Sequence, residues 1–167
     1  NMDMIQRFYF QEIKSRVDEP RKFIQVIYGP RQVGKTTLIK QVLSNITQPY
    51  IFETADDILG VDAMWLRKIW SDARLQYSQH KQELLLVIDE VQKIENWSEV
   101  IKKEWDLDTF NDVPIKLVIL GSSSLLIQKG LSESLAGRFE SIYIPHWSYK
   151  EMKDAFGWSI DEYIWFG

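Results

Sequence analysis

The order of apolar and amphipathic stretches predicts an α/β fold: a mostly parallel five-stranded sheet with helices on both faces. Two runs, 84–88 (LLLVI) and 115–120 (IKLVIL), are almost entirely apolar, as strands of a parallel sheet are when both faces are buried. Shorter runs at 23–28, 50–53 and 141–144 supply three more strands. Helical patterns separate these runs, and that alternation indicates a three-layer α/β domain.

Apolar residues recur at helical spacing in the stretches around these strands. The spacing predicts helices that include residues 4–17, 38–43, 66–77 and 97–105. Asn96 and Glu99 have the spacing of a capping box, so we expect the last of these helices to begin there.

The chain divides into three parts. Its 167 residues suffice for one compact domain with a sizeable core. We expect residues 1–21 to form an amphipathic helix that leads into the core, 22–146 to form the core, and 147–167 to begin a further helical, aromatic-rich region. Because this last part shows no clear end to a core, we expect the native protein to continue past Gly167.

Composition excludes several classes of function. The chain has no cysteine, so it can form neither a disulfide nor a thiolate metal site. No apolar run approaches the length of a membrane span, and the first residues lack the layout of a signal peptide. We therefore expect a cytoplasmic protein. The 20 basic and 24 acidic residues give a net charge of −4 without a basic stripe, which disfavours nucleic acid as a partner of this segment.

The stretch 29–37, GPRQVGKTT, contains the phosphate-binding pattern G-x-x-x-x-G-K-[ST] between a predicted strand and a predicted helix. The glycines let the backbone curl so that its N–H groups point at phosphate oxygens. Lys35 would reach the β- and γ-phosphates of a nucleotide, and the Thr36 hydroxyl would bind Mg²⁺. Arg31 and Gln32 are assigned backbone contacts only. The predicted nucleotide contacts are Gly29, Pro30, Arg31, Gln32, Val33, Gly34, Lys35, Thr36 and Thr37.

Two acids follow the buried run 84–88. Asp89 lies where an acid at the tip of a strand can hold the Mg²⁺ shell. Glu90 would face the γ-phosphate and could activate a water for in-line attack, which favours ATP hydrolysis over phosphate transfer to another molecule. The alternative is a strand that merely ends in acids.

Two further motifs leave their alternatives open. In LGSSS (120–124), a serine at the end of a central strand could contact the γ-phosphate or the attacking water, or could cap the next helix. In SLAGRFE (134–140), Arg138 could be an arginine finger, acting on a neighbouring subunit if the protein assembles, or a surface arginine beside Glu140.

Other polar residues carry weaker signals. Asp56 and Asp57 follow the strand at 50–53 and could approach the site, although acids are common in turns. His80 and His146 are isolated, without the spacing of metal ligands, so we expect both to be structural.

Taken in order, these motifs resemble one family along nearly the whole chain. The segments are GPRQVGKTTL, VIDEVQKIENW, LGSSSLLI, SLAGRFE and IPHWSYKEM. They resemble bacterial and archaeal AAA-type ATPases, in which an N-terminal ATPase domain precedes a C-terminal domain of uncharacterised function. The resemblance implies a P-loop NTPase core with an additional strand, in which the strands at 84–88 and 115–120 lie beside the P-loop strand.

The resemblance also implies ligands and roles. It implies ATP and Mg²⁺ as cofactors, Glu90 as the water-activating residue, Ser123 and Ser124 as the polar sensor, and Arg138 as the finger-type arginine. One departure is that the family commonly has Asn or Thr at the sensor position, and a serine reaches less far. A helical lid would lie beyond Gly167.

Two functions follow from these features. The first is an Mg²⁺-dependent ATPase domain whose cycle drives conformational change in a larger protein. The alternative is a nucleotide-operated switch or scaffold with little or no turnover. Besides ATP and ADP, the expected partners are further copies of the chain, reached through Arg138, and an unidentified protein.

Overall fold

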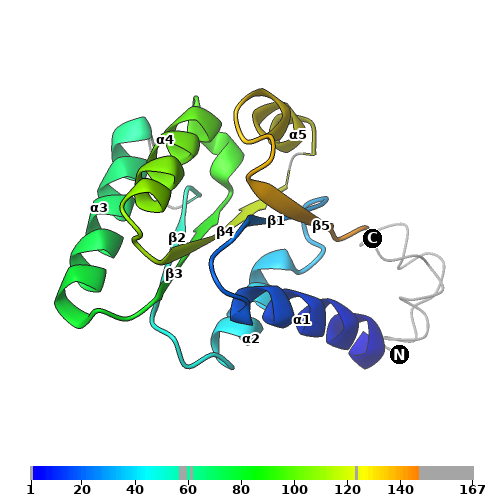
Figure 1. The fold of residues 1–167 in the computed structure, drawn as a ribbon. Coiled ribbons are helices and arrows are strands. Elements are labelled where there is room, and N and C mark those ends of the chain that lie inside the picture. Colours follow the sequence, from blue (N-terminus) through cyan, green and yellow to red (C-terminus); the bar gives the residue numbers. More distant parts are fainter. Residues whose placement is uncertain (1, 57–59, 61, 123, 147–167) are drawn as a thin grey trace.

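The fold is that of a computed structural model that describes residues 2–56, 60, 62–122 and 124–146; for 2–7, 124 and 125 it describes the backbone alone. Its strands form one sheet in the order β2-β3-β4-β1-β5, and all four neighbouring pairs are parallel (Figure 1). This confirms the predicted α/β class. The strands are β1 (Ile24–Tyr28), β2 (Tyr50–Thr54), β3 (Leu84–Asp89), β4 (Ile115–Gly121) and β5 (Phe139–Tyr143).

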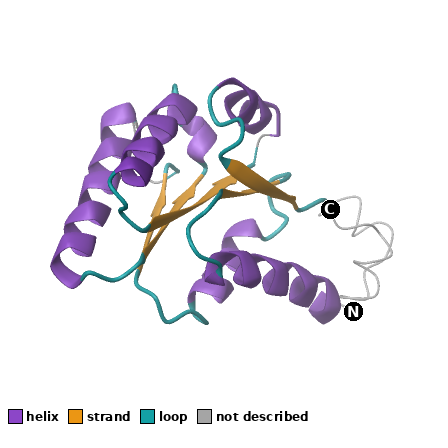
Figure 2. Ribbon diagram, viewed as in Figure 1, coloured by secondary structure: helices purple, strands orange, loops and turns teal. Residues whose placement is uncertain are grey.

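Helices cover both faces of this sheet (Figure 2). The described elements are α1 (Met2–Asp18), α2 (Lys35–Leu43), α3 (Ala63–His80), the 3₁₀ turn η1 (Val91–Lys93), α4 (Trp97–Phe110) and α5 (Ser124–Glu133). Helices α1 and α2 pack on one face, and α3, α4 and α5 pack on the other. The N-terminal helix is therefore part of a core layer. No helix within the described residues is both long and apolar enough to cross a membrane.

Alternation along β3 divides its side chains between two cores. Leu84, Leu86 and Ile88 join the core under α3, α4 and α5, whereas Leu85 and Val87 join the core under α1 and α2. Neighbouring residues of a strand point to opposite faces, so an unbroken apolar run is what a doubly covered strand requires. Full burial of one such side chain contributes roughly 1.5–3 kcal/mol.

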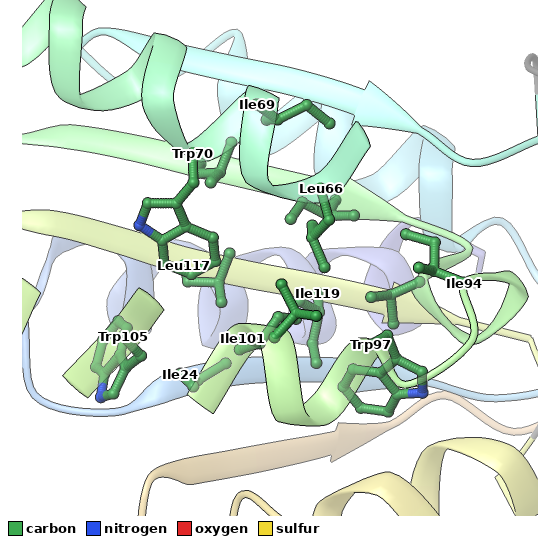
Figure 3. Close-up of a cluster of buried hydrophobic side chains, with 14 of the residues drawn as sticks. Ile24, Leu66, Ile69, Trp70, Ile94, Trp97, Ile101, Trp105, Leu117 and Ile119 are labelled. Carbon is green, nitrogen blue, oxygen red and sulfur yellow. The ribbon is translucent and has the colours of Figure 1, made fainter. Parts of the chain in front are cut away.

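Three tryptophans fill the larger core. Trp70 is fully buried and Trp97 and Trp105 nearly so, and all three lie against aliphatic side chains of α3, α4 and β4 (Figure 3). All three therefore serve the packing of this core. Trp147 and the helical pattern after it lie outside the described residues.

The predicted capping box at Asn96 is wrong. Asn96 does precede α4, but its φ is 56°, in the left-handed region, and its side chain makes no capping hydrogen bond. A capping box needs an extended N-cap residue, whose side chain can then reach back to the helix. Asp62 has that geometry at the start of α3, where its carboxylate accepts from the backbone N–H groups of Met64 and Trp65 at 3.0 and 3.1 Å.

The position of β4 decides where polar residues meet. β4 lies directly beside β1, as the resemblance implies. The implied position of β3 beside β1 is wrong, because β4 separates the P-loop strand from the strand that ends in Asp89. Because all strands are parallel, the carboxyl ends of β1, β3 and β4 share one edge of the sheet. Ligands of open α/β sheets bind at this edge.

Candidate nucleotide-binding site

The loop between β1 and α2 leaves no room for side chains at its start. A Cβ atom on Gly29 would lie 2.0 Å from the carbonyl oxygen of Ile144. The Gly29 N–H donates to the Gly121 carbonyl at 3.2 Å, which joins the loop to the end of β4. Gly34 has a φ of 82° and immediately precedes α2. Glycines at both positions therefore shape the loop, as the sequence motif predicts.

Lys35 is the first residue of α2, and its side chain is buried within the loop. Its ammonium donates to the carbonyl oxygens of Gly29, at 2.9 Å, and of Pro30. Burial lowers the pKa of Lys35, and the charges of Glu90 and Asp89 only partly offset this. A buried cation held by carbonyl oxygens at a helix N-terminus is suited to an anionic ligand.

Thr36 and Asp89 meet beside Lys35. The Thr36 Oγ1 donates to Asp89 Oδ2 at 2.9 Å, and the Glu90 N–H donates to Asp89 Oδ1 at 2.9 Å. Burial raises the pKa of Asp89, as does the charge of Glu90, against the opposing hydrogen bonds from Thr36 and from the Glu90 N–H. A carboxylate next to a hydroxyl, in a site partly shielded from solvent, is suited to bind a cation.

These oxygens fit Mg²⁺ in its usual protein setting. Mg²⁺ is generally bound by one or two protein oxygens together with water and substrate phosphates, rather than by a protein cage. Asp89 and Thr36 supply such a pair. Within the described residues, no group of three or more His, Cys, Asp or Glu side chains could form a cage on its own. His80 and His146 are both exposed.

Glu90 links the tips of β3 and β4. It has a φ of 54° and begins the turn η1. Its Oε2 accepts from Ser122 Oγ at 2.8 Å and from Gln92 Nε2 at 2.6 Å. Ser122 directly follows β4, so the serine that contacts Glu90 is one residue before the predicted pair.

The predicted sensor serines are not placed by the structure. Ser123 lies outside the described residues, and Ser124 is described in its backbone alone, as the first residue of α5. Sequence reasoning missed Ser122 and Gln92. Ser122 could have been found as the first polar side chain after the apolar run of β4; no sequence pattern singles out Gln92.

A cleft of about 330 Å³ opens in front of the loop. An ion pair between Lys93 and Asp56 lies on its wall. Asp56, whose position in a turn left its role open, therefore reaches the site, while Asp57 lies outside the described residues. The cleft is lined by Arg31, Gln32, Gly34, Lys35, Thr36, Thr37, Asp56, Glu90 and Lys93.

Arg138 lies at the opposite end of the sheet from this cleft. Its carbonyl accepts from the N–H of Ile24, the first residue of β1, while the phosphate-binding loop follows the last. Five residues of strand separate the two places, about 16 Å at the usual rise per residue. The Arg138 guanidinium forms a bidentate ion pair with Asp106 of α4. Its Nε donates to Oδ1 at 2.7 Å and its Nη2 to Oδ2 at 2.9 Å.

Comparison with known proteins agrees with this geometry. A family model described as an AAA domain matches residues 21–153. The match covers most of the chain, which therefore belongs to the AAA-domain family, as its motifs indicate. Domains of this class are P-loop domains that bind nucleotides, and the P-loop motif of this chain lies at the cleft.

The curated relatives are longer proteins. The uncharacterized protein MJ1544 of Methanocaldococcus jannaschii is 29% identical over 131 residues, covering 77% of this chain and 27% of the relative. An uncharacterized protein of Haemophilus influenzae is 29% identical over 141 residues, covering 80% of this chain and 34% of the relative. The chain thus spans about a third or less of their length.

Solved structures share the fold. The RuvB Holliday junction branch migration motor of Thermotoga maritima superposes with a TM-score of 0.57 at 20% identity, over 92% of this chain and 47% of RuvB. A structure that describes katanin self-assembly gives a TM-score of 0.54 at 20% identity, over 87% of this chain and 48% of katanin. At this identity the likeness concerns the fold alone.

Proposed function

We propose that the chain is an Mg²⁺-dependent ATPase domain whose cycle drives conformational change in a larger protein. The observation that carries the proposal is the position of Glu90. Glu90 lines the same cleft as Lys35 and Thr36, next to the Asp89–Thr36 pair. A switch that only binds nucleotide has no need of a second carboxylate there.

The reaction is an in-line displacement at the γ-phosphorus of ATP. A water oxygen bonds to that phosphorus, the bond to the β-phosphate bridging oxygen breaks, and ADP leaves. Glu90 orients the water and accepts its proton. Lys35 turns from the loop carbonyls to the β- and γ-phosphates, where its charge offsets the charge of the transition state. Thr36 and Asp89 would hold Mg²⁺, which would supply positive charge to neutralise the phosphates.

Arg138 acts on the cleft of a neighbouring subunit in this proposal. It is too far from its own P-loop to contact a nucleotide there, and its side chain remains partly exposed beside Asp106. An arginine supplied in trans contributes about 10³–10⁵ in rate in other P-loop enzymes. The active form is then a homo-oligomer, and the described self-assembly of katanin, which shares the fold, is compatible with that.

The second candidate is a nucleotide-operated switch. It is favoured by the location of Arg138, because Arg138 then does not reach the cleft of its own subunit. In that case ATP would lock an assembly with an unidentified protein partner, and turnover would be slow. The acidic balance argues against nucleic acid as a partner of this segment, and the lack of cysteine supports a cytoplasmic setting.

The test is the ATP hydrolysis rate per subunit, measured against protein concentration with Mg²⁺. We expect a rate that rises with concentration and is abolished in Lys35→Ala. Glu90→Gln should reduce turnover to a small residual rate while leaving ATP affinity within about threefold. A wild-type rate that equals the Lys35→Ala rate at every concentration, together with retained ATP binding, would exclude the hydrolase and favour the switch.

A further inference from the structure

The side-chain amide of Gln92 lies against the carboxylate that the proposed reaction uses. We propose that Gln92 is a positioning residue, which together with Ser122 fixes Glu90 so that one carboxylate oxygen remains available to the attacking water. This inference rests on the proposed hydrolytic role of Glu90.

Hydrogen bonding fixes the orientation of the amide. Gln92 Nε2 donates to Glu90 Oε2 at 2.6 Å and to Ser122 Oγ at 3.2 Å, and Ser122 Oγ donates to Glu90 Oε2 at 2.8 Å. The three side chains thus form a closed triangle. Exchanging the nitrogen and oxygen of Gln92 would place its carbonyl oxygen against a carboxylate, so the observed orientation is the favourable one.

This orientation leaves Gln92 Oε1 buried and without a hydrogen-bond partner among the described residues. Burying an unpaired polar atom costs about 1–3 kcal/mol. Methionine has nearly the same length and would avoid that cost. Packing alone therefore does not explain a glutamine here, whereas donation to Glu90 does.

The backbone is arranged to bring the amide to this place. Glu90 adopts a left-handed φ of 54°, and the Lys93 N–H bonds to the Glu90 carbonyl at 3.1 Å, so the chain folds back at once. β4 ends in Gly121, where a Cβ atom would lie 2.9 Å from Gln92 Oε1 and 2.4 Å from Ile127 Cδ1. The turn after Glu90 and the glycine at the end of β4 thus leave space for the Gln92 amide.

Positioning follows from where the hydrogen bonds end. Both side-chain donors bind Oε2 of Glu90, and no described residue donates to Oε1. Two donors on one oxygen limit rotation of the carboxylate and leave the other oxygen for water. Gln92 does not line the cleft, so its loss should affect the chemical step and not nucleotide binding. A displacement of about 1 Å in a catalytic group can cost about 10²-fold in rate.

The experiment compares kcat and KM of the wild-type chain with those of Gln92→Met, which keeps the size and removes both donors. Gln79→Met is the matched control, because Gln79 is exposed near the end of α3, away from the cleft. We expect Gln92→Met to lower kcat by about 10- to 100-fold, with KM within twofold, and Gln79→Met to change neither. Gln92→Glu, which places an acceptor against Glu90, should lower kcat at least as far.

The same substitution in a Glu90→Gln background shows whether Gln92 acts through Glu90. We expect no further loss of kcat there, because the group that Gln92 positions is already removed. In the nucleotide-free protein, the shift of the urea midpoint in the double variant should differ from the sum of the shifts caused by Gln92→Met and Glu90→Gln separately. This second readout needs no activity.

Three outcomes would overturn the inference. A Gln92→Met rate equal to that of Gln79→Met would remove the positioning role and leave the ATPase standing. An undiminished effect in the Glu90→Gln background, or additive urea midpoints, would mean that Gln92 acts elsewhere. If wild type does not exceed Lys35→Ala, the proposed hydrolase itself fails and the inference fails with it.

Discussion

Two lysines are buried near opposite ends of the sheet, and they differ in what surrounds their charge. Lys35, at the carboxyl end of β1, is 6% exposed, and Lys116, near the amino end of β4, is 7% exposed. Each ammonium donates to two main-chain carbonyls. Lys116 also pairs with the Glu83 carboxylate at 2.9 Å, whereas no ion pair joins Lys35 to a carboxylate in the described part of the chain.

The difference separates a lysine that stabilises the fold from one that is available to a ligand. Lys116 binds the carbonyl oxygens of Val17 and Glu19, at the end of α1, and so fastens that helix to the sheet. Lys35 binds only its own loop, and burial lowers its pKa, which means that its charge is less stable there than in water. An incoming phosphate would relieve that cost.

The largest expected effect concerns nucleotide affinity. Lys35→Met should weaken ATP binding by about 100-fold, because loss of one partner of a buried charge pair costs about 2–5 kcal/mol. Titration with a fluorescent ATP analogue measures this. Lys40→Met is the matched control on the same helix, since Lys40 is exposed and does not line the cleft. A loss below threefold, or an equal loss in both variants, would contradict the role of Lys35.

Stability should respond to the two lysines with opposite signs. Lys116→Met should lower the free energy of unfolding by about 2–3 kcal/mol, because it leaves two carbonyls and Glu83 without their cation. Lys35→Met should raise the free energy of unfolding of the nucleotide-free protein by roughly 1 kcal/mol, since removal of a buried charge that has no ion pair outweighs the loss of its two hydrogen bonds to loop carbonyls. Urea unfolding measures both. Equal destabilisation by the two substitutions would remove the contrast.

Two aspartates of α4 extend the comparison. Asp108 is 1% exposed and accepts from Trp70 Nε1 at 2.6 Å and Arg74 Nε at 2.7 Å, whereas Asp106 pairs with Arg138 near the surface. Asp108→Asn should lower the free energy of unfolding by about 1–2 kcal/mol, and Asp106→Asn by less than about 0.5 kcal/mol. Thermal or urea unfolding of the two variants measures these losses. Similar losses in free energy of unfolding would show that burial of the aspartate does not determine the effect of the substitution.

The smallest expected effect is a pH dependence. The hydrogen bond from Arg138 lowers the pKa of Asp106 below its ordinary value of 3.8, against a smaller opposing effect of burial. The stabilisation from this pair is therefore fully present above about pH 4 and is lost as pH falls through the lowered folded pKa. The difference in urea midpoint between wild type and Asp106→Asn should shrink from pH 7 to pH 3, and at pH 7 it should shrink with added salt. A difference that is constant with pH would contradict the pairing.

The sequence by itself determined the class of fold and the position of the phosphate-binding motif in it. Unbroken apolar runs indicate which strands are covered on both faces. Because this pattern is local in the sequence, it can be recognised without a structure. The stretch GPRQVGKTT and the pair Asp89–Glu90 are also local motifs. These two motifs lie close together because the strands they follow are parallel, so that their carboxyl ends lie at the same edge of the sheet.

Only the tertiary structure decided which residues from separate segments meet. The ends of β3 and β4 bring Ser122 against Glu90. The turn at Glu90 brings Gln92 back onto the same carboxylate, and the left-handed Asn96 removes the expected cap. Arg138 lies at the far end because it precedes a strand parallel to β1. Each outcome depends on a backbone angle or on strand pairing, and residue spacing alone fixes neither.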